Sequence, residues 1–197
     1  MWGIAYLVAS YLIGSVSAAI LVCRLMGKGD PRSVGSGNPG ATNVLRAYGK
    51  FPALLTLAGD VLKGFLPVVI AAGLKLDSTI VAGAGVAAFI GHLYPVFFGF
   101  KGGKGVATLI GVLFGYDWRL GLCFIVTWLA VAAVSRYSSL AALCATLASP
   151  LYALLLGLPL PYALALGVMA PAVFWRHAEN IQRLRAGTEG RIGAKRA

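Results

Sequence analysis

The chain has 197 residues, of which 59% are hydrophobic and only 12% are charged, and its mean hydropathy is +0.83. An ordinary globular domain is about 45–50% apolar and about 25% charged. This chain therefore has too little polar surface to coat a soluble core, and we expect lipid to be the solvent for much of it. Its length fits one compact unit, so we predict a single membrane-embedded domain over residues 1–197.

The charge is strongly basic, with 17 Lys and Arg against 6 Asp and Glu and a net charge of +11. The basic residues interrupt apolar runs and form no separate arm, which argues against binding of nucleic acid. Anionic membrane lipid or a phosphorylated substrate fits this pattern better. The three cysteines lie singly in apolar runs, and their odd number excludes a framework of paired disulfides.

The apolar runs predict an all-α, polytopic integral membrane protein with about seven transmembrane helices. A helix needs roughly 20 apolar residues to cross the hydrocarbon core of a bilayer. The predicted passes are residues 2–23, 51–72, 78–100, 106–115 and 120–134, and two passes within 140–173 that separate at 157–161. Because the fourth pass is short, five passes with two re-entrant hairpins are the alternative.

The distribution of basic residues predicts that the N-terminus lies outside and the C-terminus in the cytoplasm. In this orientation 14 of the 17 basic residues lie in inner segments, with Lys75 and Arg119 outside and Lys63 within a pass. Residues 2–23 lack the basic stretch that precedes the apolar run of a cleaved signal peptide. The polar residues that can do chemistry fall in three inner segments, so we expect a site at the cytoplasmic face.

Segment 1, residues 34–46, is rich in glycine and in hydrogen-bond donors. Gly35, Gly37 and Gly40 permit backbone conformations in which successive N–H groups converge on an anion. Side-chain donors are supplied by Ser36, Asn38, Thr42, Asn43 and Arg46. A plain turn rich in Gly and Asn is the alternative. The GxGxxG match in this segment does not indicate a dinucleotide site, because that motif requires a preceding strand.

Segment 2, residues 91–108, contains a second candidate phosphate site. Its central residues, which have the composition of a phosphate cradle at the start of a helix, are Lys101, Gly102, Gly103, Lys104 and Gly105. It is not a Walker A loop, because Gly105 stands where that motif has Ser or Thr. Lysines that flank a flexible turn on the positive-inside face are the alternative. His92, in the same segment, fits a hydrogen-bonding residue at a helix end better than a catalyst.

Segment 3, residues 176–189, contains His177 and Asn180, which share one face if the segment is helical. His177 is one of two histidines in the chain and a candidate general base near pH 7. A basic amphipathic helix at the membrane surface, without a catalytic role, is the alternative.

Two charges and one turn outside these segments also stand out. Asp60 and Lys63 are one helical step apart in the second pass, so we predict an intramembrane ion pair whose role is either functional or structural. The turn at residues 135–139 is a weaker candidate that can supplement the site.

Two patterns that are typical of many enzymes, a metal-binding cluster and the HxxxxD motif, are absent from the sequence. The six carboxylates form no cluster and the two histidines lie far apart in the sequence, so we expect no metal site. The HxxxxD pair of many acyltransferases is missing too, because Phe97 and Gln182 stand five residues after the two histidines. A reaction here would need an already activated donor, positioning and charge neutralisation.

These three segments resemble the motifs of the bacterial acyl-phosphate:glycerol-3-phosphate acyltransferase family. The similar stretches are VGSGNPGATNVLR at 34–46, GHLYPVFFGFKGGKGVAT at 91–108 and RHAENIQRL at 176–184. The resemblance implies transfer of a fatty acyl group from acyl phosphate to the 1-hydroxyl of glycerol 3-phosphate, which gives lysophosphatidic acid and phosphate, the first step of phospholipid synthesis. It also implies a multi-pass protein of the bacterial inner membrane that uses neither metal nor cofactor. Acyl phosphate, glycerol 3-phosphate and membrane lipid would be its partners, and no sequence feature indicates an obligate protein partner.

The family's motif residues match Ser36, Asn38, Asn43, Arg46, Gly102, Gly103, Lys104, Gly105, His177 and Asn180. We expect Ser36, Arg46, His177 and Asn180 to take part in catalysis and the other donors of segments 1 and 2 to bind substrate. Segment 1 would hold the donor phosphate and Lys104 the acceptor phosphate. Either His177 or a phosphate oxygen of a substrate would receive the proton. A transporter or flippase for an anionic lipid or phosphate ester is the alternative function.

Overall fold

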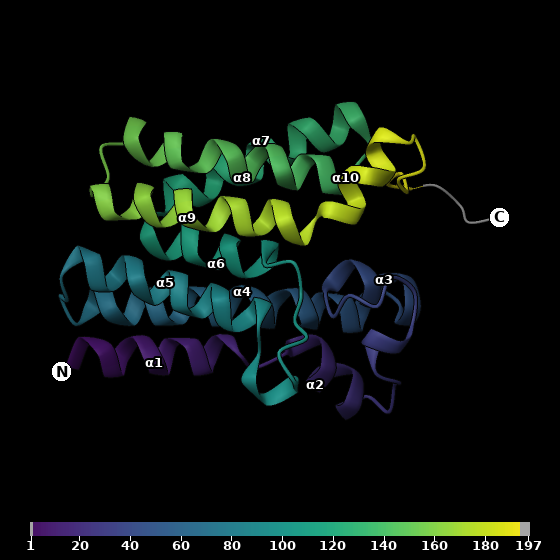
Figure 1. The fold of residues 1–197 in the computed structure, drawn as a ribbon, viewed down its shortest axis with the longest axis horizontal. Coiled ribbons are helices and arrows are strands. Elements are labelled where there is room, and N and C mark those ends of the chain that lie inside the picture. Colours follow the sequence, from purple (N-terminus) through teal and green to yellow (C-terminus); the bar gives the residue numbers. More distant parts are fainter. Residues whose placement is uncertain (1, 194–197) are drawn as a thin grey trace. The chain divides into compact units, whose positions relative to one another are not determined.

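The structure is a computed structural model, and it describes residues 2–193. These residues form ten α-helices and two short 3-10 helices, with no strand among them (Figure 1). The predicted all-α class is therefore confirmed. The chain divides into two compact units, Met1–Tyr116 and Asp117–Ala197, and each is described separately.

The first unit contains segments 1 and 2. Its elements are α1 (Trp2–Gly14), α2 (Ala18–Leu25), η1 (Pro31–Ser33), α3 (Ala41–Tyr48), α4 (Lys50–Gly73), α5 (Ser78–Leu93), η2 (Val96–Phe98) and α6 (Val106–Tyr116). Segment 1 comprises the loop between η1 and α3 together with most of α3, and segment 2 runs from the end of α5 into α6.

Glycines let the long helices of this unit approach closely. The helix α4 packs against α6 and α5, and α1 packs along α5 (Figure 1). A Cβ on Gly111 would collide with the carbonyl of Val61, and one on Gly14 with the carbonyl of Ala88. Helices in lipid gain little from hydrophobic burial, so close contact through small residues is how such helices stabilise one another.

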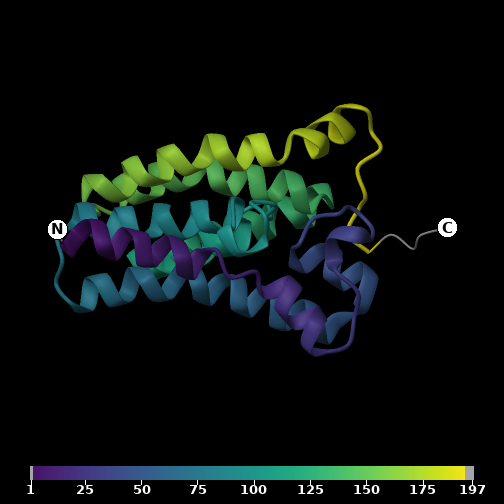
Figure 2. The ribbon, with the colours of Figure 1, turned by 60° about the horizontal axis from the view of Figure 1, so that its bottom comes forward.

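The short helix α3 is anchored beneath segment 1 by Val44. This side chain is fully buried in an apolar cluster with Ala19, Cys23 and Ala53, and Tyr48 packs against the cluster. The cluster joins α3 to α2 and to the first turn of α4, and both short helices pack against α4. Figure 2 shows the three helices together near one end of the unit. Segment 1 is thus anchored to α2 and α4 of its own unit.

The second unit contains segment 3. Its elements are α7 (Trp118–Ser135), α8 (Ser138–Leu155), α9 (Leu160–Arg176) and α10 (Ala178–Arg185). The helix α8 packs against both α7 and α9, and α10 contacts α8 and α9. The predicted division within residues 140–173 is confirmed, since α8 ends at Leu155 and α9 begins at Leu160.

Each predicted pass corresponds to a helix or to a pair of helices. Among residues 2–193, four segments are long and apolar enough to cross a membrane, and these are Lys50–Gly73, Ser78–Phe98, Trp118–Ser135 and Ser138–Leu155. Many of their large apolar side chains, such as Leu54 and Val126, are exposed on the protein surface, as lipid-facing residues are. The helices α6 and α9 are shorter but also apolar.

The first pass differs from the continuous helix that we predicted. It is a bent pair, α1 and α2, with an angle of 43° at the break. The break falls at residues 15–17, where Ser17 becomes the N-cap of α2 and its hydroxyl accepts a hydrogen bond from the backbone N–H of Ile20. An apolar composition sets the length of a pass but does not reveal such a break. Lys195 and Arg196, counted when we predicted the orientation, lie outside the described residues.

Candidate active site

Segment 1 folds around the side chain of Asn43, which is buried. The Asn43 Oδ1 accepts a hydrogen bond from the backbone N–H of Ser36 at 3.0 Å. Its Nδ2 donates to the carbonyl oxygens of Pro31 and Val34, at 2.8 and 3.0 Å. Gly35 has a φ of +62°, and a Cβ there would collide with Asn43 Oδ1. Asn43 therefore orders the loop, and its predicted contact with substrate stays a prediction.

The polar groups of this loop that face outward are those expected to meet a ligand. The side chains of Ser36, Thr42 and Arg46 are exposed, and that of Asn38 is half-buried. Within residues 2–193, no hydrogen bond or ion pair engages the Arg46 guanidinium. Segment 1 therefore presents a cation and hydroxyl donors beside an ordered, glycine-rich backbone, which suits an anion.

The glycine-rich loop of segment 2, residues 101–105, packs against the last turn of α5. A Cβ on Gly102 would collide with the carbonyl of His92, and one on Gly103 with Nε2 of its imidazole. The backbone N–H of Gly103 donates to the carbonyl of His92 at 3.2 Å. Gly105 has a φ of +89° and packs on Phe89, directly before α6 begins. The glycines let the backbone lie on α5, which leaves half-buried Lys104 near the start of α6.

Arg32 connects segments 1 and 2, and sequence analysis treated it only as a basic residue of an inner segment. Its Nη1 donates to the carbonyl oxygen of Phe98 in η2 at 3.0 Å. Its Nε and Nη2 donate to the two carboxylate oxygens of Asp30, at 3.1 and 2.8 Å. The Arg32 hydrogen bonds hold the pKa of Asp30 below its ordinary value, so the pair stays charged. The first unit therefore holds segments 1 and 2 together.

The predicted intramembrane ion pair is confirmed. Lys63 Nζ lies 2.8 Å from Oδ1 of Asp60, one helical step away on α4. The same ammonium donates to the carbonyl oxygen of Val16, in the break between α1 and α2, at 2.7 Å. The Nδ1 of His92 lies 3.6 Å from Asp60 Oδ1. The contact of His92 with this pair could not be predicted from the sequence, because it links two different helices.

Segment 3 begins at a junction between two helices. The helix α9 ends at Arg176, His177 stands between, and α10 begins at Ala178. His177 and Asn180 are both buried there. His177 Nδ1 lies 2.8 Å from the carbonyl oxygen of Val173. A carbonyl only accepts, so in the neutral imidazole the proton is on Nδ1 and the lone pair is on Nε2, as a general base requires.

Glu189 fixes Asn180 and was not singled out by sequence analysis. Its Oε1 accepts hydrogen bonds from Nδ2 of Asn180 at 2.6 Å and from the hydroxyl of Ser139 at 2.7 Å. Its Oε2 accepts from Nε of Arg183, also at 2.7 Å. Burial alone would raise the pKa of Glu189, but these three hydrogen bonds and the Arg183 charge hold it below the ordinary value. Ser139 comes from the turn at 135–139, so that turn supports segment 3.

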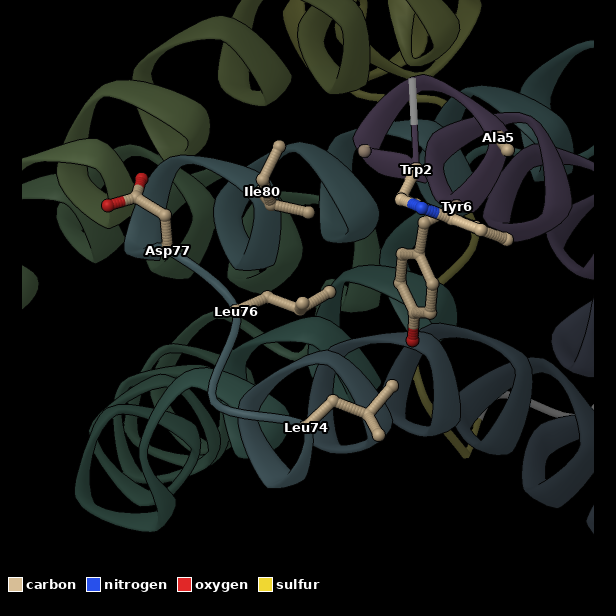
Figure 3. Close-up of a pocket in the computed structure, with 8 residues that line it drawn as sticks. Trp2, Ala5, Tyr6, Leu74, Leu76, Asp77 and Ile80 are labelled. Atoms are coloured by element: carbon tan, nitrogen blue, oxygen red, sulfur yellow. The ribbon is translucent and has the colours of Figure 1, made fainter.

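A separate pocket lies at the opposite ends of α4 and α5 from segments 1 and 2. It is lined by the start of α1 and by the connection between α4 and α5, with Trp2, Tyr6, Leu74 and Ile80 among its residues (Figure 3). Its charged residue is Asp77, whose carboxylate caps α5 by accepting from the N–H of Thr79 at 2.8 Å. The pocket is otherwise apolar and carries none of the predicted site residues.

Comparison with known proteins identifies the family. Residues 4–187 match the profile of the family described as Glycerol-3-phosphate acyltransferase. A glycerol-3-phosphate acyltransferase of Thioalkalivibrio sulfidiphilus is 53% identical over 191 residues, which is 97% of this chain and 94% of the relative. That of Halorhodospira halophila is 53% identical over 194 residues, 98% of each chain.

Solved structures agree with the sequence relatives. The crystal structure of PlsY (YgiH), an integral membrane glycerol 3-phosphate acyltransferase in its glycerol 3-phosphate form, matches with a TM-score of 0.92 at 41% identity. The match covers 98% of this chain and 96% of the PlsY chain. The lysophosphatidic acid form of that protein matches with a TM-score of 0.91 at 40% identity and the same coverage. The chain therefore belongs to the family of integral membrane glycerol-3-phosphate acyltransferases that includes PlsY.

Proposed function

We propose that this enzyme transfers a fatty acyl group from acyl phosphate to the 1-hydroxyl of glycerol 3-phosphate. The products are lysophosphatidic acid and inorganic phosphate. The observation that carries this proposal is the pair of glycine-rich segments that the first unit holds together through Arg32 and Phe98. Each segment offers backbone N–H groups and basic side chains, Arg46 in segment 1 and Lys101 and Lys104 in segment 2. Two segments of this kind suit a reaction in which both substrates carry a phosphate dianion.

Segment 1 is assigned to the donor. Ser36, Arg46 and the backbone N–H groups of the loop would bind the phosphate of acyl phosphate and stabilise its charge as it leaves. Acyl phosphate is a mixed anhydride with a good leaving group, so no covalent enzyme intermediate is needed. Charge neutralisation by preorganised donors is a large catalytic effect in such a site.

Segment 2 is assigned to the acceptor. Lys104, Lys101 and the glycines between them would bind the phosphate of glycerol 3-phosphate and so hold its 1-hydroxyl in place. Fixing two reactants in the right geometry contributes several kcal/mol to lowering a barrier, roughly 7–11 in well-oriented systems. The glycerol 3-phosphate and lysophosphatidic acid forms of the related crystal structure support these two compounds as substrate and product.

His177 is assigned to proton transfer. The 1-hydroxyl oxygen attacks the acyl carbonyl carbon, the bond from that carbon to the phosphate oxygen breaks, and the hydroxyl proton moves to Nε2 of His177. A phosphate oxygen of a substrate is the alternative acceptor of this proton. Asn180, held by Glu189, would orient the hydroxyl or the imidazole. We further propose that both units act as one acyltransferase domain with its site at the cytoplasmic face of the bacterial inner membrane.

The choice of donor tests the proposal. Purified protein in detergent would receive labelled glycerol 3-phosphate with either palmitoyl phosphate or palmitoyl-CoA, each with and without EDTA. We expect lysophosphatidic acid to form with palmitoyl phosphate and not with palmitoyl-CoA, at a rate that EDTA leaves unchanged. Product from palmitoyl-CoA alone would contradict the assigned donor, and loss of product in EDTA would contradict metal-free chemistry. Absence of product with both donors would contradict the proposed reaction.

A further inference from the structure

Three titratable side chains form a buried cluster in the first unit, and the mechanism above uses none of them. Asp60, Lys63 and His92 are 2%, 7% and 6% exposed. Asp60 Oδ1 lies between the other two, 2.8 Å from Lys63 Nζ and 3.6 Å from His92 Nδ1. The cluster therefore joins the middle of α4 to the last turn of α5.

Stability alone is a poor reason for such a cluster. Charges within a membrane span are costly and usually serve a function. A buried ion pair adds little stability compared with well-packed apolar residues of the same volume. One task of Lys63 is evident, because it donates to the Val16 carbonyl at the break between α1 and α2. Backbone groups freed by a break within a bilayer need such a partner. This task does not explain why His92 lies against the pair.

The imidazole of His92 has the glycine-rich loop of segment 2 on its other side. Its Nδ1 faces Asp60, while Gly103 packs on its Nε2 so closely that a Cβ would collide. The His92 carbonyl accepts the N–H of Gly103 and is covered by Gly102. A change in the orientation of His92 would therefore displace the backbone at residues 102–103. Lys104 is the next residue and would move with it.

We infer that Asp60 and His92 are positioning residues for Lys104. The Asp60 carboxylate, held by Lys63, fixes the orientation of the His92 ring. His92 then forms the surface on which residues 102–103 rest, and the loop presents Lys104 to the substrate phosphate. This inference deepens the proposed function and rests on the assignment of Lys104 to glycerol 3-phosphate.

Four variants of the full-length enzyme in detergent test this inference. They are Asp60→Asn, His92→Phe, Lys63→Met and the double variant Asp60→Asn/Lys63→Met. Asp77→Asn and Lys75→Met are matched controls, because both residues lie at the opposite end of the unit. The measurements are KM for glycerol 3-phosphate, kcat and the midpoint of thermal unfolding. We expect Asp60→Asn and His92→Phe to raise this KM about tenfold, while kcat stays within about threefold and the controls keep wild-type values.

The double variant separates positioning from stability. Breaking a buried pair leaves one uncompensated charge, whereas removing both charges restores much of the lost stability. We expect the double variant to recover the part of the unfolding midpoint that Lys63→Met loses through the unpaired Asp60 carboxylate, but not the part lost with the hydrogen bond to the Val16 carbonyl, and to keep the raised KM. Recovery of KM together with the midpoint would show a merely structural role and overturn the inference. A folded His92→Phe enzyme with wild-type KM would overturn it as well.

A further variant, Lys104→Met, separates the assignment of Lys104 to the substrate phosphate from the positioning role of Asp60 and His92. If it leaves KM for glycerol 3-phosphate unchanged, the assignment of segment 2 in the proposed function is wrong and the inference fails with it. If it raises KM while Asp60→Asn and His92→Phe do not, the inference alone fails.

Discussion

Arg32 donates a hydrogen bond of 3.0 Å to the carbonyl oxygen of Phe98, across 66 positions of the sequence. Asp30 holds the guanidinium from its other edge through Nε and Nη2. The planar fork of arginine thus connects the entry to segment 1 with the 3-10 helix of segment 2. Lysine has one ammonium and cannot reproduce both interactions in this geometry.

Replacing Arg32 with lysine therefore tests whether the two segments depend on each other. We expect Arg32→Lys to lower kcat/KM about tenfold, equivalent to about 1.4 kcal/mol of transition-state stabilisation. The KM values for donor and acceptor should both rise, because the connection affects both segments. Arg24→Lys, at an exposed site on α2, is the charge-matched control and should behave as wild type. Equal losses in the two variants would contradict a specific role for the Arg32 hydrogen bonds in joining the two segments.

Gly35 tests the packing of Asn43 inside segment 1. Its matched control is Gly27, which has nearly the same φ, +64° against +62°, but open space around a Cβ. Both substitutions to alanine carry the cost of a left-handed conformation, about 1 kcal/mol. Gly35→Ala must also displace Asn43, so we expect it to lose at least tenfold more activity than Gly27→Ala. Comparable activity in steady-state assays of both variants would mean that the loop tolerates movement of Asn43.

Glu189 predicts a particular dependence of stability on pH. Because its pKa is lower in the folded state than the ordinary value of 4.5, its stabilising effect is complete above that value. The effect is lost as the pH falls through the lowered pKa of the folded state. We expect Glu189→Gln to lower the midpoint of thermal unfolding at pH 7 by a few degrees. Each kcal/mol of lost stability lowers this midpoint by about 2–4 °C. The difference from wild type should shrink below pH 4.5.

The control for the Glu189 carboxylate is Glu179→Gln, on the helix α10 that Glu189 contacts through Asn180 and Arg183. The Glu179 side chain is 80% exposed, and its ion pair with Arg183 is long, at 3.7 Å. Surface pairs of this kind contribute little, so its unfolding midpoint at pH 7 should match that of wild type. A midpoint of Glu189→Gln that equals the control at every pH would contradict the role of Glu189 in holding segment 3.

The orientation of the chain is tested by chemical labelling. In a variant with alanine at Cys23, Cys123 and Cys144, a single cysteine would replace either Lys75 or Arg185. We expect a membrane-impermeant maleimide to label the Lys75→Cys protein in cells whose outer membrane has been made permeable. The Arg185→Cys protein should react only after the inner membrane is broken. The reverse pattern would show that the predicted orientation is inverted.

The helices and the intramembrane ion pair could be predicted because they depend on local sequence. Runs of about 20 apolar residues set the passes. Asp60 and Lys63 are three residues apart, so the sequence predicts that they pair on one face of a helix. The break at residues 15–17 could not be predicted, because the Lys63 ammonium that satisfies the Val16 carbonyl comes from another helix.

In the candidate site, too, local features could be predicted from the sequence and contacts between distant residues could not. Glycine-rich composition indicated both candidate phosphate segments, but not the residues that hold them in place. Arg32 and Phe98 are 66 positions apart, and Ser139 and Glu189 are 50 apart. Such contacts arise from packing between distant parts of the chain, so no local sequence pattern predicts them. The inward position of Asn43 was hidden for a related reason, since an asparagine in a turn can equally donate to its own backbone or to a ligand.

The most direct test of the central claim follows the phosphate. Wild-type enzyme would be given palmitoyl phosphate with a labelled phosphate group, and released phosphate and lysophosphatidic acid would be counted together. Direct transfer predicts one phosphate released for each lysophosphatidic acid formed, and neither product without glycerol 3-phosphate. Phosphate release at an undiminished rate without glycerol 3-phosphate, or lysophosphatidic acid formed without phosphate release, would contradict direct acyl transfer between two phosphate-bearing substrates.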